Sequence, residues 1–125
     1  MNWYRTFPLL LLLIPLAGGC STQLPQAANP GQAQAALKSA LEAWQKGETP
    51  ESLQSRSPAI HVNDSGWEAG ERLVNYEIQS EQASGQSWKA RVLLTVQRGG
   101  NAPLQQQVSY TVDTNPAVVV VRDFE

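Results

Sequence analysis

The spacing of apolar side chains changes once along this chain, near Pro58, and this change restricts the fold more than any other feature. Between residues 30 and 47 apolar side chains recur every three or four positions, whereas from Ile60 onward they alternate with polar ones. The first spacing is that of an amphipathic helix, and the second is that of strands with one buried face. A helical segment followed by several strands predicts an α+β domain.

The first helix is predicted to begin at Pro30. Asn29 is a preferred N-cap residue, Pro30 suits the first turn, and Gly47 suits the residue that ends a helix. The apolar stripe of this helix comprises Ala33, Leu37, Ala40, Leu41 and Trp44. A second, short helix is predicted to begin at Pro50 and to end before Pro58, because the residue before a proline is pushed out of helical geometry.

Alternating segments predict up to five strands. Their apolar positions are Ile60 and Val62; Val74, Tyr76 and Ile78; Trp88, Ala90, Val92, Leu94 and Val96; Leu104, Val108, Tyr110 and Val112; and Val118 to Val121. Residues 98–103, which contain Gly, Asn and Pro, predict a hairpin loop between the third and fourth strands. The last run is apolar on both faces, so it is either a central strand or an edge to which a partner strand could add; the central position is favoured.

These elements predict a single α+β domain over residues 30–125, in which the two helices pack on a curved antiparallel sheet of four to five strands. The helical stripe is expected to cover the sheet face that carries Trp88 and Tyr110. The opposite face is expected to be solvated. Its side chains include Lys89, Arg91, Gln97, Gln105, Gln107 and Thr111.

This order of elements resembles the cystatin-like and NTF2-like group of folds, in which a curved sheet cradles a helix. NTF2-like enzymes place acids, histidines and tyrosines in the cone between sheet and helix. The resemblance therefore implies His61, Glu77 and Tyr110 as candidates for a general acid or base. The alternation of the strands favours another interpretation, in which His61 and Glu77 face solvent and Tyr110 lies in the core.

A second resemblance is local and covers residues 41–78. Its motif consists of Leu41-x-Ala43-Trp44, Thr49-Pro50, Ser57-Pro58-x-Ile60-x-Val62-x-Asp64, Trp67, Gly70, Leu73 and Tyr76-x-Ile78. The motif resembles a block found in small, uncharacterised bacterial exported proteins and lipoproteins. That group implies no activity.

Residues 1–19 are predicted to be a signal peptide. Their apolar run ends in Gly18-Gly19-Cys20 and is shorter than the roughly 20 apolar residues that a membrane-spanning helix needs. This ending resembles the lipobox of bacterial lipoproteins, which implies cleavage between Gly19 and Cys20 and two or three acyl chains on Cys20. The alternative is an ordinary secretory signal followed by an unmodified cysteine.

Residues 20–29 are predicted to be a lipidated tether, because they show neither charge nor periodicity. From residue 21 to residue 29 the extended chain reaches at most about 30 Å. Ser21 stands where lipoproteins kept at an inner membrane often carry Asp. In a host with two membranes, the resemblance therefore implies an outer-membrane lipoprotein that faces the periplasm. The lipid bilayer is the expected partner of Cys20.

Charge and composition disfavour several classes of function. Loss of 19 of the 125 residues leaves 106, which carry eight Lys and Arg against eleven Asp and Glu, a net charge of −3. No basic stripe could neutralise a run of phosphates, so nucleic-acid binding is disfavoured. A single histidine and scattered carboxylates predict no metal site. No cofactor motif, nucleophile elbow or catalytic cysteine is found, so a non-catalytic domain is favoured over an enzyme.

Two features near the middle of the chain have competing interpretations. Trp67, Gly70, Leu73 and Tyr76 recur every third residue. They form either an aromatic patch that faces a ligand, or a loop in which Trp67 covers the core and Gly70 allows a tight turn; the loop is favoured. Asp64 is interpreted as a turn residue whose side chain bonds to the nearby backbone.

The sequence thus favours a membrane-anchored envelope lipoprotein with a non-catalytic binding or structural domain. The rival hypothesis is an NTF2-like domain with a small-molecule-binding or weakly catalytic pocket that contains His61 or Glu77. The candidate protein partners are an envelope protein and a second copy of the chain bound through the polar sheet face.

Overall fold

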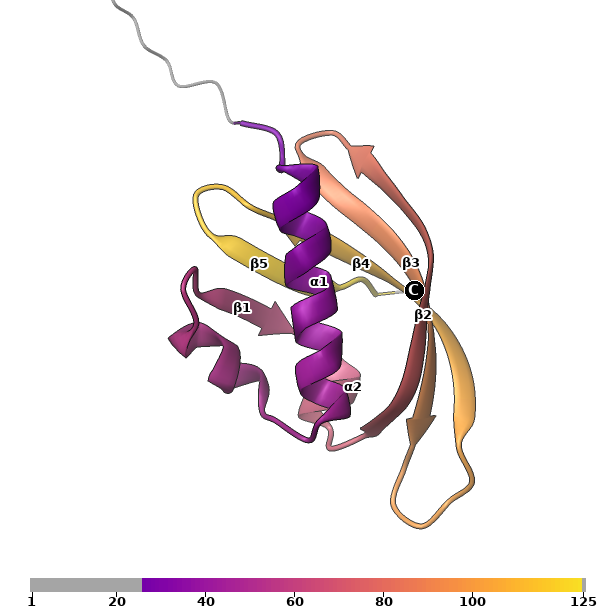
Figure 1. The fold of residues 1–125 in the computed structure, drawn as a ribbon. Coiled ribbons are helices and arrows are strands. Elements are labelled where there is room, and N and C mark those ends of the chain that lie inside the picture. Colours follow the sequence, from indigo (N-terminus) through magenta and orange to yellow (C-terminus); the bar gives the residue numbers. More distant parts are fainter. Residues whose placement is uncertain (1–25, 125) are drawn as a thin grey trace, which may run out of the picture.

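The structure is a computed structural model that describes residues 26–124. The predicted signal peptide, the cleavage site and Cys20 lie outside the described residues. The elements follow the predicted order, with helices first and strands after them (Figure 1). They are α1 (Pro30–Gln45), the 3-10 helix η1 (Pro50–Ser55), β1 (Ile60–Asn63), α2 (Ser65–Glu68), β2 (Arg72–Ser84), β3 (Ser87–Gln97), β4 (Leu104–Asp113) and β5 (Val118–Arg122).

Helix α1 begins as the sequence predicts. The Asn29 side chain accepts a hydrogen bond from the Gln32 N–H at 2.9 Å, which satisfies one of the free amides of the first turn. The whole predicted stripe is buried, and two further alanines extend it. Ala33, Ala36, Leu37, Ala40, Leu41, Ala43 and Trp44 are each at most 4 % exposed. Neither α1 nor any other helix within residues 26–124 is long and apolar enough to cross a membrane.

Strands β3 and β4 present their apolar positions to the core, and α1 crosses this inner face of the curved sheet (Figure 1). The buried side chains are Trp88, Ala90, Val92, Leu94, Val96, Val108, Tyr110 and Val112. Leu104 is an exception, because it belongs to the same face yet is 56 % exposed. It is the first residue of β4, next to the loop of the β3–β4 hairpin, and this hairpin extends beyond the end of α1 (Figure 1).

The sheet is mixed, so the prediction of an antiparallel sheet is wrong for one strand pair. The strand order is β1-β5-β4-β3-β2, in which the last four strands form an antiparallel meander and β1 pairs parallel with β5. The chain crosses from β1 at one edge to β2 at the other, and it then reverses direction at each hairpin of the meander. These reversals leave β5 running in the direction of β1. The alternation within β1 does not reveal its partner.

Strand β5 is central, as the sequence favours. It lies between β1 and β4, where Val118 and Val120 are buried on the inner face. Val119 and Val121 are half-buried on the outer face. The polar side chains that the sequence places on the outer face are exposed or half-buried, which confirms the prediction of a polar outer face. They are Lys89, Arg91, Gln97, Gln105, Gln107 and Thr111.

Hydrogen bonds join the described part of the predicted tether, residues 26–29, to the rest of the domain. The Ala28 N–H donates to the Gln86 carbonyl at 2.8 Å. The Asn29 N–H donates to the Thr114 hydroxyl at 2.9 Å. The start of the described chain is therefore held in place by two distant segments.

These two segments are turns at one end of the sheet, which we call the entry end. Residues 84–87 connect β2 to β3, and residues 114–117 connect β4 to β5. Helix α1 also begins there (Figure 1). The last turn of α1, helix α2 and the β3–β4 hairpin lie at the opposite end.

Candidate functional site

The three residues that the NTF2-like resemblance implies as an acid or base are not brought together. His61 on β1 and Glu77 on β2 lie on opposite edge strands, and both are exposed, as the alternation predicts. Four strand spacings of about 4.8 Å separate these edges. Tyr110 is 1 % exposed on the inner face of β4, which confirms its predicted place in the core.

A buried carboxylate, Asp64, lies at the centre of a polar cluster that the sequence does not reveal. Asp64 is 1 % exposed and is the N-cap of α2, where it accepts hydrogen bonds from the N–H groups of Gly66 at 3.0 Å and Trp67 at 3.3 Å. These bonds confirm the predicted local chemistry, although they begin a short helix. The carboxylate also accepts from the Tyr110 hydroxyl at 2.5 Å and from Arg122 Nη1 at 3.2 Å.

Arg122 reaches Asp64 because it takes an inward-facing position of β5. Its side chain is only 10 % exposed. The contact also depends on Gly66, since a Cβ there would collide with Arg122 Nη1 and come within 3.0 Å of Glu71 Oε2. A glycine is therefore needed at the start of α2 for the guanidinium to approach.

Glu71 extends the cluster from the turn between α2 and β2. Its side chain is 10 % exposed, and its Oε1 accepts from Arg98 Nε at 2.7 Å. No group within residues 26–124 donates to its buried Oε2. Two carboxylates and two guanidinium groups thus balance one another: Asp64, Glu71, Arg98 and Arg122. The Asp64–Arg122 pair is costly to break, because loss of either side chain leaves the other buried and unpaired. The Arg98 side chain is 58 % exposed, so its pair with Glu71 contributes less.

The protonation of Tyr110 follows from this environment. Burial raises the pKa of Tyr110 well above its ordinary value of 10.0, and the charge of Asp64 and the hydrogen bond to it raise the pKa further. The hydroxyl therefore stays protonated and donates to Asp64. The site disfavours the phenolate that a base at Tyr110 would require.

We expect the free energy of unfolding to fall as the pH rises above about 10. The unfolded chain releases the tyrosine proton near pH 10.0, whereas folded Tyr110 retains it. The contribution of Tyr110 is complete below that pH, and above it is lost by up to about 1.4 kcal/mol per pH unit. Urea unfolding between about pH 8 and pH 11 measures the slope.

Tyr110→Phe should make this slope shallower. Tyr76, whose pKa is also raised by burial and by Glu42, accounts for part of the slope that remains. An identical slope in the wild type and in Tyr110→Phe would show that the buried hydroxyl does not cause the alkaline loss of stability.

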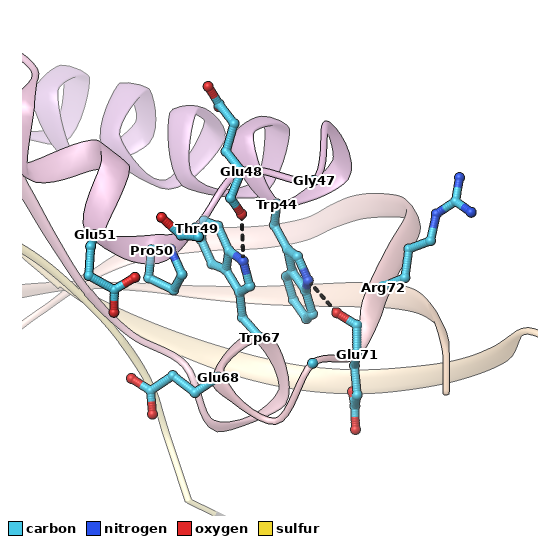
Figure 2. A pocket seen from close by; sticks show the side chains of 11 residues that line it. Trp44, Gly47, Glu48, Thr49, Pro50, Glu51, Trp67, Glu68, Glu71 and Arg72 are labelled. Atoms are coloured by element: carbon cyan, nitrogen blue, oxygen red, sulfur yellow. Dashed lines mark hydrogen bonds between the residues drawn. The ribbon is translucent and has the colours of Figure 1, made fainter. Parts of the chain in front are cut away.

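Two tryptophans stack at the end of the domain that carries α2. The rings of Trp44, in the last turn of α1, and Trp67, in α2, have centroids 5.6 Å apart and planes within 11° of parallel. Trp44 Nε1 donates to the Glu71 carbonyl at 2.7 Å, and Trp67 Nε1 donates to the Glu48 carbonyl at 3.0 Å (Figure 2). Trp67 is 8 % exposed, which confirms its predicted role as a cover for the core.

The other residues of the three-residue repeat also have structural positions. Gly70 has a φ of +88°, a conformation that glycine adopts without strain, and it allows the chain to turn from α2 into β2. Leu73 is 1 % exposed in the core, and Tyr76 is half-buried. The favoured interpretation of a covering loop is confirmed.

A groove of about 500 Å³ opens beside the stacked rings, and we call it the tryptophan groove. The α1–η1 connection, α2 and the start of β2 contribute its lining, which includes Trp44, Pro50, Glu51, Trp67, Glu68 and Arg72. Figure 2 shows Glu51 and Glu68 on one side of the ring pair and Arg72 on the other. An apolar wall with charged groups on both sides can orient a bound partner.

Two other glutamates of the groove have arginine partners. Glu48 lies 3.6 Å from Arg56, and Glu71 lies 2.7 Å from Arg98. Among residues 26–124, no three His, Cys, Asp or Glu side chains are grouped closely enough to hold a metal ion. The groove therefore offers carboxylate and guanidinium contacts beside Trp67, which is 8 % exposed.

No family model, curated protein or solved structure matches this chain. The interpretation of its site therefore depends on the geometry of its own residues. Two features stand out by that geometry: the closed cluster around Asp64, which joins strands to α2, and the tryptophan groove, which is open to solvent on the same end of the domain.

Proposed function

We propose that this chain is a lipid-anchored envelope protein, held by acylated Cys20, whose domain binds a partner in the tryptophan groove without catalysing a reaction. The observation that supports the proposal best is the position of the elements that line the groove. The last turn of α1 and helix α2 lie at the end of the domain opposite the entry end (Figure 1). Membrane attachment at one end leaves the groove at the other end open to the aqueous compartment. In a host with two membranes, that compartment is the periplasm.

Helix α1 sets the scale of this separation. It begins at the entry end, and Trp44 lies in its last turn. Its 16 residues, at about 1.5 Å each, span about 24 Å. The groove and the attachment point therefore do not compete for space.

An envelope protein is the partner that we propose for the groove. Aromatic side chains and arginine are enriched at protein interfaces, and the groove presents Trp67 and Arg72 together. The exposed positions of His61 and Glu77 on opposite sheet edges give no support to a catalytic pocket built on them.

The cystatin-like or NTF2-like assignment of the fold is part of the same proposal. Its support is the position of α1 on the inner face of a curved, five-stranded sheet (Figure 1). Folds of this kind host unrelated functions, so the assignment does not imply an activity.

Cys20→Ala tests the anchor. Without the thiol no acyl chain can be attached, and each buried methylene contributes about 0.8 kcal/mol to membrane binding. We therefore expect the variant to leave the membrane fraction entirely and to appear in the soluble fraction of the cell envelope, as measured by fractionation and immunoblotting.

Ser21→Ala is the matched control, because it changes the adjacent residue and keeps the cysteine. This control should remain in the membrane fraction. If Cys20→Ala protein that lacks residues 1–19 also remained there, attachment through Cys20 would be ruled out.

A further inference from the structure

The start of the described chain is bound to one end of the domain, and this limits how an anchored domain can face its membrane. Gln26 Oε1 accepts a hydrogen bond from Asn115 Nδ2 at 3.4 Å. The backbone bonds from Ala28 and Asn29 described above end on the same pair of turns. A chain that comes from the membrane must therefore reach the domain at the entry end.

The connection to the proposed anchor is short. Only residues 21–25 separate the acylated Cys20 from Gln26, and the six residue steps from 20 to 26 extend over at most about 20 Å. This is less than the length of about 24 Å that α1 alone spans. An acylated Cys20 would therefore keep the entry end near the lipid headgroups, whereas Trp44 of the tryptophan groove lies about one helix length away from the entry end.

The composition of the two ends agrees with this orientation. The turns of the entry end read Ser-Gly-Gln-Ser and Thr-Asn-Pro-Ala and contain no charged side chain. The opposite end carries Glu48, Glu51, Glu68, Arg72 and Arg98. Charged groups lose hydration when they are pressed against another surface, and neutral turns avoid most of that cost.

We propose that the entry end is the membrane-facing surface of the domain, and that a lipid bilayer is its partner. The short connecting segment, residues 21–25, holds the two turns beside the headgroups, and the tryptophan groove points away from the bilayer. This inference rests on the proposed function, since it requires an acylated Cys20.

Site-specific fluorescence on the lipidated full-length protein tests the orientation. Cys20 is the one native cysteine, and its thiol is consumed by acylation, so an introduced cysteine can be labelled alone. The two label positions are Ser84→Cys in the entry end and Asn101→Cys in the β3–β4 loop, both at exposed residues. The proteins are reconstituted into phosphatidylethanolamine–phosphatidylglycerol vesicles that carry a short-range quencher on the lipid headgroups.

We expect the label at position 84 to be quenched and the label at position 101 to keep its full fluorescence. Equal quenching at both positions, or stronger quenching at position 101, would overturn the orientation while leaving the anchor intact. Vesicle-bound protein with neither label quenched would also overturn it. Protein that does not co-sediment with the vesicles would overturn the anchor itself, and the orientation with it.

A variant with a longer connecting segment tests whether the short segment, rather than direct binding of the turns to lipid, keeps the entry end at the membrane. Insertion of about 20 Gly and Ser residues after Ser21 adds a flexible chain with an end-to-end distance of about 25 Å. Quenching at position 84 should then be lost. Undiminished quenching in this variant would show that the short connecting segment does not hold the turns at the membrane.

Discussion

Asp64→Ala should lower the free energy of unfolding by about 3–5 kcal/mol, because it leaves the Arg122 guanidinium and the Tyr110 hydroxyl without their acceptor in the interior. The same change removes the N-cap of α2, which adds to the loss. Domains of this size are stable by about 5–15 kcal/mol, so much of the total disappears. Urea unfolding near neutral pH, followed by circular dichroism, measures the difference.

Two variants complete this test. Asp64→Asn keeps one acceptor oxygen, which can cap α2, but it places an NH2 donor opposite the Tyr110 hydroxyl and loses the charge opposite Arg122, so it should lie between the wild type and Asp64→Ala. Asp123→Ala is the matched control, because that carboxylate lies 3.6 Å from Lys89 with its side chain 24 % exposed, and partly exposed pairs contribute at most about 1 kcal/mol. Similar losses for Asp64→Ala and Asp123→Ala would mean that the buried cluster is not a major source of stability.

Trp67→Ala should also cost about 3–5 kcal/mol of stability, since it removes a large buried ring and leaves a cavity against Trp44. The loss includes the stacking contact and the hydrogen bond to the Glu48 carbonyl. Because the ring also forms a wall of the groove, binding of the proposed partner should fall with the same substitution. Urea unfolding again gives the free energy of unfolding.

Trp67→Phe keeps an aromatic ring for Trp44 and should recover part of the loss. The control for aromatic truncation is Phe124→Ala, because Phe124 is 95 % exposed and surface substitutions usually change stability by less than about 0.5 kcal/mol. A cost below about 1 kcal/mol for Trp67→Ala would contradict its role as a cover for the core.

The elements that the sequence predicts best are those with repeated local signals. Helix α1 combines a cap, a proline and a regular stripe, and β3 alternates over its whole length. Every residue predicted on the buried face of each is buried, and only Ala36 and Ala43 of α1 are added to it. Leu104 shows the limit of this rule. Alternation assigns a side chain to a face, but it does not report how far the covering helix reaches. Leu104, the first residue of β4, is 56 % exposed although it belongs to the inner face.

The polar cluster could not be predicted in the same way, because its contacts join residues far apart in the chain. Asp64 is 46 residues from Tyr110 and 58 residues from Arg122. The sequence around Asp64 is fully explained by local turn chemistry. Arg122 carries the one usable signal, since it takes an inward position on a valine-rich strand and a buried charge needs a partner. That signal does not identify which carboxylate pairs with Arg122.

The tryptophan groove was only partly predictable. The stripe of α1 contains Trp44, and Trp67 is interpreted as a cover for the core, so each ring is placed correctly on its own. Their stacking depends on how α2 returns beneath the end of α1, which is a matter of tertiary packing. The charged rim follows from that arrangement, so Glu51, Glu68 and Arg72 carry no signal of their own in the sequence.

The mass of the amino-terminal peptide, measured on protein purified from envelope membranes, tests the proposed lipid anchor most directly. We predict that the mature chain begins at Cys20, that residues 1–19 are absent, and that the first peptide carries the added mass of a diacylglyceryl group. A chain that begins at Met1, or an amino-terminal peptide with an unmodified Cys20, would contradict the anchor.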